Sequence, residues 1–260
     1  MTIVINNLDW LITVDKSRRI IKNGSIVVSD GLIQFVGKTG ERARVDGENV
    51  IDGKGLIAVP GLIDTSVSVV QQLGRGLGDL CDIPEYRLNR VASYEAALHP
   101  DDARAAARHF ALEMIRAGST FFVDTGSRYP LEIAQTVVEQ GLKGIVGFAC
   151  QDVFDTPMGP YATNAARLDL EQVLERAERA IIQIREIGRD LVAPCICIPW
   201  LTGCSDALGA ALSDLANKHD LPVVVSASAS RDEAVHSRIH SRMTEIKRLE
   251  KLGLLGARTI

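Results

Sequence analysis

The chain has 260 residues, of which 46% are hydrophobic and 24% are charged, and its net charge at pH 7 is −4. These values are typical of a globular protein with one large domain, or with one large and one small domain. No block of Lys and Arg stands out and no run of about 18 apolar residues occurs, so nothing supports nucleic-acid binding, a membrane-surface role or a transmembrane helix. We therefore expect a cytoplasmic protein.

The cysteine pattern fits the same compartment. Five cysteines are scattered along the chain, at Cys81, Cys150, Cys195, Cys197 and Cys204. Cys195 and Cys197 lie two apart in an apolar run, so in a strand their side chains would share one face. A Cys-x-Cys zinc or redox site is one interpretation. We favour the other, buried apolar packing in a reducing environment.

Residues 1–59 have the pattern of short strands joined by turns. The stretches "TIVINNLDWLITVD" and "IIKNGSIVVSDGLIQFVGK" alternate apolar and polar residues. Asn23-Gly24 and several Asp-Gly pairs interrupt them, and such pairs are typical of tight hairpin turns. We predict a small N-terminal β-sandwich over residues 1–59.

From Pro60 onward, apolar runs alternate with helical patterns. The runs predict strands at 61–70, 119–126, 142–150, 190–200 and 221–230, and "LLGARTI" at the end resembles the start of a sixth. Between them lie helical stretches, one closed by Gly118 and one capped by Ser205 or Asp206. This α/β order predicts a parallel sheet. We interpret residues 60–260 as a partial TIM-like (β/α) barrel of about five to six units, where closure needs eight.

Three segments together carry a family resemblance: "VIDGKGLIAVPGLIDTSVSV", "RAGSTFFVDTG" and "LVAPCICIPWLTGCSDALGAALSDLANKHDLPVVVSASAS". The chain resembles the amidohydrolase superfamily over its whole length, in particular the branch of cytosine and guanine deaminases and triazine hydrolases. The resemblance implies a (β/α)8 barrel with a small β-sandwich and a Zn or Fe ion that activates water. It also implies metal ligands: a His-x-His after the first strand, a His after the fifth, a His on the sixth and an Asp on the eighth. A Glu beyond the fifth-strand His often shuttles protons.

In this sequence, the positions that correspond to the expected His and Glu residues hold other residue types. The first-strand pair falls on Ser66 and Ser68, the fifth-strand His on Ser226, and the Glu on Ala229. The sixth- and eighth-strand positions lie beyond Ile260. A neutral serine hydroxyl is a weak ligand for Zn or Fe beside imidazole. We therefore expect that the isolated chain assembles no metal site and holds neither ion.

Other polar residues at the expected rim leave alternatives open. Asp124 ends the second barrel strand and would either orient a substrate or cap the turn that follows. His236 and His240 are four apart, a spacing that suits a metal pair on a helix, but the sequence fixes no third ligand and we favour a surface role. A serine nucleophile would need a base within reach. We predict a vestigial pocket, with a possible small-molecule ligand, formed by Ser66, Ser68, Asp124, Trp200, Ser226 and Ser228.

An incomplete parallel sheet leaves an unpaired edge, and parallel strands are apolar on both faces. We therefore expect a protein partner or self-association that covers the open barrel edge. The leading hypothesis is a pseudoenzyme, a non-catalytic accessory or structural subunit that pairs with another chain. The alternative is a subunit of an active metal-dependent hydrolase that acts on C–N or C–Cl bonds of a cyclic nitrogenous small molecule, with the site completed by a partner chain. A truncated product is a third possibility.

Overall fold

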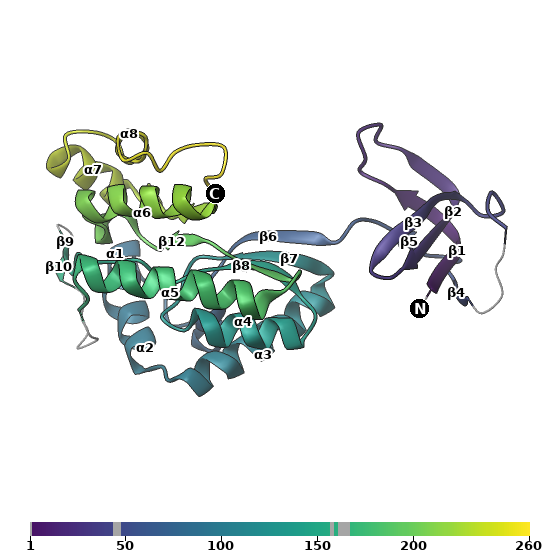
Figure 1. Ribbon diagram of the computed structural model, residues 1–260, viewed down its shortest axis with the longest axis horizontal. Helices are drawn as coiled ribbons and strands as arrows, with labels where there is room; N and C mark the ends of the chain where they lie inside the picture. Colours follow the sequence, from purple (N-terminus) through teal and green to yellow (C-terminus); the bar gives the residue numbers. More distant parts are fainter. Residues whose placement is uncertain (1, 44–47, 157–158, 161–166) are drawn as a thin grey trace. The chain divides into compact units, whose positions relative to one another are not determined.

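The computed structural model describes residues 2–43, 48–156, 159–160 and 167–260. The chain divides into two compact units, Met1–Gly61 and Leu62–Ile260 (Figure 1). Within the described residues, no helix combines the length and the apolar character needed to cross a membrane.

The N-terminal unit is a five-stranded sheet, which confirms the β-rich start of the chain. Its strands are β1 (Thr2–Ile12), β2 (Ile20–Ser29), β3 (Leu32–Lys38), β4 (Asn49–Asp52) and β5 (Ile57–Ala58). The order is β3-β2-β1-β4, and β5 also pairs with β1. β1, β2 and β3 are antiparallel neighbours, whereas β4 and β5 run parallel to β1. The alternating pattern buries Val4, Leu8, Leu11 and Val27.

The prediction of a hairpin turn at Asn23-Gly24 is wrong, because both residues lie inside β2. Asn23 has a φ of 52°, and the pairing of β1 with β2 shifts nearby, between Ile5 and Leu8. A Cβ on Gly24 would come within 2.6 Å of Leu11 Cβ. The glycine therefore allows β1 and β2 to approach each other closely at this point. The tight turn that joins β2 to β3 is Asp30-Gly31, with φ values of 54° and 77°.

The second unit begins with a four-stranded parallel sheet in the order β11-β8-β7-β6. Its strands are β6 (Leu62–Val67), β7 (Ser119–Asp124), β8 (Lys143–Val146) and β11 (Val192–Pro194). The predicted strand at 190–200 is split: β12 (Ile196–Ile198) follows β11 and pairs in parallel with β13 (Val223–Val225). Isolated bridges Ala149↔Cys197 and Val223↔Thr259 extend the array in both directions. The prediction of a TIM-like α/β fold with about five to six βα units is confirmed.

Helices follow the strands as the sequence predicts. The barrel helices are α3 (Pro100–Ala117), α4 (Pro130–Glu139), α5 (Leu170–Gly188), α6 (Asp206–His219), α7 (Arg231–His240) and α8 (Glu245–Lys251). Shorter elements are η1 (Val69–Gly74), α1 (Ile83–Glu85), η2 (Tyr86–Val91), α2 (Ala92–Ala97), η3 (Leu201–Gly203), β9 (Asp155–Thr156) and β10 (Gly159–Pro160). Gly118 ends α3 with a φ of 78°, and the Ser205 side chain accepts from Leu208 N at the start of α6, so both predicted ends are confirmed.

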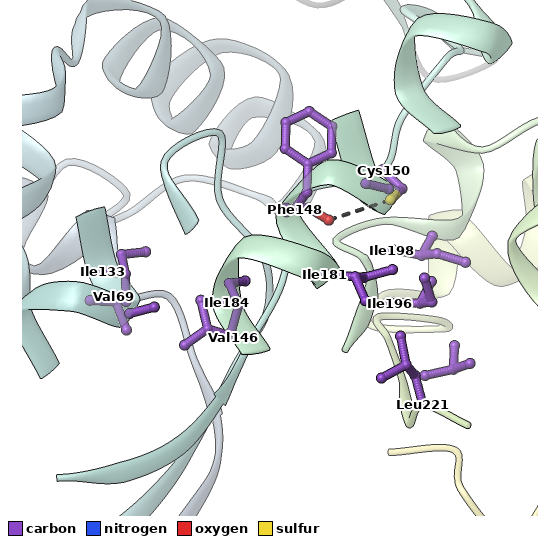
Figure 2. Close-up of a cluster of buried hydrophobic side chains, with 14 of the residues drawn as sticks. Val69, Ile133, Val146, Phe148, Cys150, Ile181, Ile184, Ile196, Ile198 and Leu221 are labelled. Atoms are coloured by element: carbon purple, nitrogen blue, oxygen red, sulfur yellow. Dashed lines mark hydrogen bonds between the residues drawn. The ribbon is translucent and has the colours of Figure 1, made fainter. Parts of the chain in front are cut away.

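The core of this unit lies between the parallel strands and their helices (Figure 2). Ile133, Ile181 and Ile184 from α4 and α5 are buried together with Val146 and Ile196 from the strands. The rings of Phe110 and Phe122 meet edge to face at 4.9 Å between centroids, which joins α3 to β7. This packing fixes where the carboxyl end of each strand emerges, and the site is built at those ends.

Candidate functional site

A cavity of about 300 Å³ opens at the carboxyl ends of the parallel strands. Its walls come from residues in or just after β6, β7, β12 and β13, and from the segment that spans η1 to α2. The carboxyl end of the strands is where enzymes of (β/α) barrel type place their active sites. The polar and aromatic lining residues include Ser66, Ser68, Gln71, Tyr86, Arg87, Glu95, Arg128, Trp200 and Ser226.

Four of the six residues predicted to form a pocket meet here: Ser66, Ser68, Trp200 and Ser226. Asp124 does not line the cavity but is buried beneath it. Its Oδ1 accepts a hydrogen bond from Val69 N at 3.0 Å, and its Oδ2 accepts one from Gly126 N at 3.2 Å. Of the two roles considered for Asp124, this geometry is the capping one, and burial raises the pKa of the carboxyl to about 7.

Ser228 and Ala229 lie in the loop after β13, held by two buried carboxylates. The Ser228 hydroxyl donates to Glu245 Oε2 at 2.8 Å, and the Ser228 backbone N donates to the same oxygen. The Ala229 backbone N donates to Glu233 Oε2 at 2.7 Å. Desolvation raises the pKa of Glu233. These carboxylates fix the loop at the position where the family resemblance expects a proton-shuttling Glu.

Arg87 is a site residue that the sequence reasoning missed. Its Nη1 donates to Pro199 O at 3.0 Å and its Nη2 to Ser226 Oγ at 2.8 Å. Its Nε lies 3.8 Å from Glu233 Oε1, and the guanidinium sits 5.3 Å from the centroid of the Trp200 ring. No local sequence signal indicates that Arg87 belongs to the site, because its hydrogen bond to Ser226 joins residues 139 positions apart.

A chain of hydrogen bonds orients Glu95, which the sequence reasoning also missed. The Tyr86 hydroxyl donates to Gln71 Oε1 at 3.0 Å, and Gln71 Nε2 donates to Glu95 Oε1 at 2.8 Å. Desolvation raises the pKa of Glu95, while the Gln71 hydrogen bond and the charge of Arg128 oppose that rise. The cavity lining therefore combines a carboxylate in a fixed orientation with the guanidinium groups of Arg87 and Arg128.

The residues present do not fit the metal that the family resemblance implies. Ser66, Ser68 and Ser226 offer hydroxyl oxygens, and Ser68 Oγ is hydrogen-bonded to Thr125 Oγ1 at 2.7 Å. Ser226 Oγ already accepts from Arg87, whose positive charge would repel a divalent cation at that point. Among the described residues, no cluster of three or more His, Cys, Asp or Glu side chains could hold an ion.

The two other metal candidates lie apart from the cavity lining. His236 and His240 stack on α7 with ring centroids 5.6 Å apart. Cys195 and Cys197 are buried, with their Sγ atoms 3.3 Å apart. The shared hydrogen bond and burial hold the pKa of the Cys197 thiol well above its usual range, so the thiolate that metals bind is disfavoured.

Residues 57–260 match the model of the Amidohydrolase family. The chain belongs to the amidohydrolase family. It is 29% identical over 241 residues to 5'-deoxyadenosine deaminase of Methanothermobacter thermautotrophicus, an alignment that covers 92% of this chain and 53% of the relative. It is 29% identical over 257 residues to 5-methylthioadenosine/S-adenosylhomocysteine deaminase of Halothermothrix orenii, covering 98% and 56%. The chain thus spans about half the length of these curated relatives.

Solved structures share the fold. A guanine deaminase from C. acetobutylicum with bound guanine superposes with a TM-score of 0.84 at 23% identity, covering 100% of this chain and 61% of that one. An atrazine chlorohydrolase from Arthrobacter aurescens complexed with zinc gives a TM-score of 0.80 at 20% identity, covering 99% and 59%. The family resemblance inferred from the sequence is therefore confirmed, and zinc is bound by at least one protein of this fold.

These relatives overturn the leading functional hypothesis. The expectation of a non-catalytic accessory subunit, a pseudoenzyme, is wrong, because the proteins that match nearly the whole chain are named deaminases, which are hydrolytic enzymes. The error has a physical reason. Ser66, Ser68 and Ser226 show only which metal-ligand positions this chain itself fills. The chain spans about half the length of the deaminase that it matches. The serines at these positions are therefore not evidence for a non-catalytic role.

Proposed function

We propose that this chain is part of a hydrolase that acts on a C–N bond of a cyclic nitrogenous small molecule, such as an amino-substituted purine or its nucleoside. One observation carries the proposal: the cavity lies at the carboxyl ends of parallel strands, within the segment 57–260 that matches the amidohydrolase family. The names of the curated relatives, both deaminases of adenine nucleosides, support the substrate class.

The lining of the cavity suits a flat heterocycle. Tyr86, Phe148 and Trp200 provide aromatic surface for a ring. A guanidinium has five N–H donors, and Pro199 O and Ser226 Oγ take two of those on Arg87 while a third lies toward Glu233. Two donors remain for a ring nitrogen or carbonyl oxygen of the ligand. Glu95 supplies an acceptor for a ligand N–H or hydroxyl group.

The group that activates water comes, in this proposal, from a partner chain. The hydroxyl set of this chain does not suit the family's metal, so the chain binds and orients the substrate. The strand β6 is last in the sheet order, and Leu62 and Ile63 on it are 58% and 64% exposed. An open edge of that kind offers backbone groups and apolar area to another polypeptide.

Purification of the protein from its native source tests the proposal. The isolated chain and the native assembly are assayed for ammonia release from 5'-deoxyadenosine, methylthioadenosine and guanine. We expect turnover by the assembly and little by the isolated chain, with turnover reduced at least about tenfold by Glu95→Gln through loss of a charged hydrogen-bond acceptor. Arg108→Gln, on the exposed face of α3, is the matched control. An assembly that is folded and complete but releases no ammonia from any amino-substituted heterocycle would contradict the proposal.

A further inference from the structure

Arg128 is a cavity-lining cation on a rigid loop. It follows β7 and is half-buried. The residues on each side are fixed: Ser127 Oγ accepts from Tyr129 N at 3.0 Å, and the Tyr129 hydroxyl donates to Leu98 O at 2.6 Å. Ser127 also forms a parallel bridge with Phe148. The guanidinium of Arg128 is therefore presented to the cavity from a backbone that cannot easily move away.

The charge of Arg128 has no partner in contact within the described residues. Several other arginines of this unit are paired, as Arg104 is with Asp101, Arg167 with Asp155 and Arg248 with Asp206, each at 2.8 Å. Glu95 feels the charge of Arg128, but no ion pair or hydrogen bond of the described residues joins the two side chains, and Gln71 holds the carboxylate. Two opposite charges thus line one cavity without an ion pair between them among the described residues.

Arg87 does not fill the same role. Its side chain is 20% exposed, and its Nε lies 3.8 Å from Oε1 of the fully buried Glu233, so its charge has a partner. It offers hydrogen bonds, and its positive charge faces the Glu233 carboxylate. Arg128 is accordingly the group that can select for an anionic ligand.

We propose that Arg128 is a specificity-determining residue that binds a carboxylate substituent on the ring of the ligand, while Glu95 accepts an N–H of the same ring. The planar fork of a guanidinium matches a carboxylate with two parallel hydrogen bonds. A cavity of about 300 Å³ is at the small end of the range for ligand sites, which suits one ring with a compact substituent. The inference rests on the pocket assigned under the proposed function and narrows its substrate class to acidic nitrogen heterocycles.

Calorimetric titration of the purified chain tests this assignment. Orotate carries a ring N–H beside a carboxylate, methyl orotate has nearly the same shape without the charge, and uracil lacks the substituent. We expect orotate to bind at least about tenfold more tightly than methyl orotate, which is the selectivity that one charge-assisted contact supplies. Arg128→Gln should abolish that selectivity and leave the uracil affinity unchanged. Arg108→Gln removes one exposed positive charge from the same unit and should keep the selectivity.

Thermal melts accompany the titrations, and Arg128→Gln should leave the melting temperature nearly unchanged because it breaks no hydrogen bond or ion pair of the described residues. Equal affinities for orotate and methyl orotate in the unaltered chain would overturn the inference. So would selectivity that survives Arg128→Gln, or the absence of orotate binding at millimolar concentration. Because these are equilibrium measurements, selective binding without ammonia release by the native assembly would refute the proposed function and leave the Arg128 assignment intact.

Discussion

The buried carboxyl of Asp124 makes the stability of the second unit depend on pH. Its side chain is 0% exposed, and desolvation raises its pKa from 3.8 to about 7, although two backbone N–H groups oppose the rise. The folded state therefore prefers the neutral acid. The stabilisation is fully present below about pH 4 and is lost as the pH rises through 7. A pKa raised to that extent corresponds to about 4 kcal/mol of unfolding free energy between the two ends of the window.

Urea unfolding from pH 4 to pH 8.5 measures this effect. A Trp10→Phe background leaves Trp200 as the fluorescent reporter of the second unit. We expect the unaltered background to lose stability over this range, and Asp124→Asn to lose much less because its side chain cannot ionise. Glu139→Gln, which removes an exposed carboxylate from the end of α4, should follow the unaltered curve. Parallel curves for Asp124→Asn and the unaltered background would refute the reasoning.

Three further predictions concern single side chains and metal content. Arg87→Met should lower the unfolding free energy by about 3 kcal/mol in urea melts, because it leaves Glu233 buried without its cation. The double variant Arg87→Met with Glu233→Gln should recover part of that loss. An unchanged urea midpoint for Arg87→Met alone would contradict this prediction. Ser205→Ala should cost about 1 kcal/mol by removing the α6 cap, whereas Ser205→Asn should retain most of it. Elemental analysis of the isolated chain should find zinc and iron well below one equivalent, and one tightly bound equivalent would refute the mismatch between the hydroxyl set and the family's metal.

The order of strands and helices could be predicted because its signals are local. Alternating apolar runs, the glycine after α3 and the serine before α6 each act over a few residues, and the structure places Gly118 and Ser205 as expected. The prediction of a turn at Asn23-Gly24 failed because this dipeptide occurs both in turns and in irregular strand pairs. The two cases differ here in a tertiary contact, the close approach of Leu11 to Gly24. The local pattern also could not show that the strand at 190–200 would divide.

The site was only half predictable, for a reason of topology. Ser66, Ser68, Trp200 and Ser226 stand at strand ends, so the fold class alone brings them together. Arg87 and Glu95 come instead from the segment between β6 and α3, which carries no periodic signal. Their positions depend on contacts across the barrel, such as the bond from Arg87 to Pro199 over 112 residues. Tertiary packing, absent from any short window of sequence, determines these positions.

Ser226, which stands where the family resemblance expects His, and Arg87 depend on each other. The family resemblance expects imidazole at that strand end, where it would hold a cation. Here a guanidinium occupies the neighbourhood, and it requires a small acceptor, which the serine hydroxyl provides at 2.8 Å. Positive charge is therefore retained at the strand end, but it now belongs to a fixed donor of hydrogen bonds. Such a group can orient an oxygen or nitrogen of a ligand but cannot lower the pKa of a bound water as a metal ion does. Under the proposed function, substrate recognition by this chain is separate from water activation, and variants at Arg87 and at Ser226 should show non-additive effects on ligand affinity in calorimetric titrations.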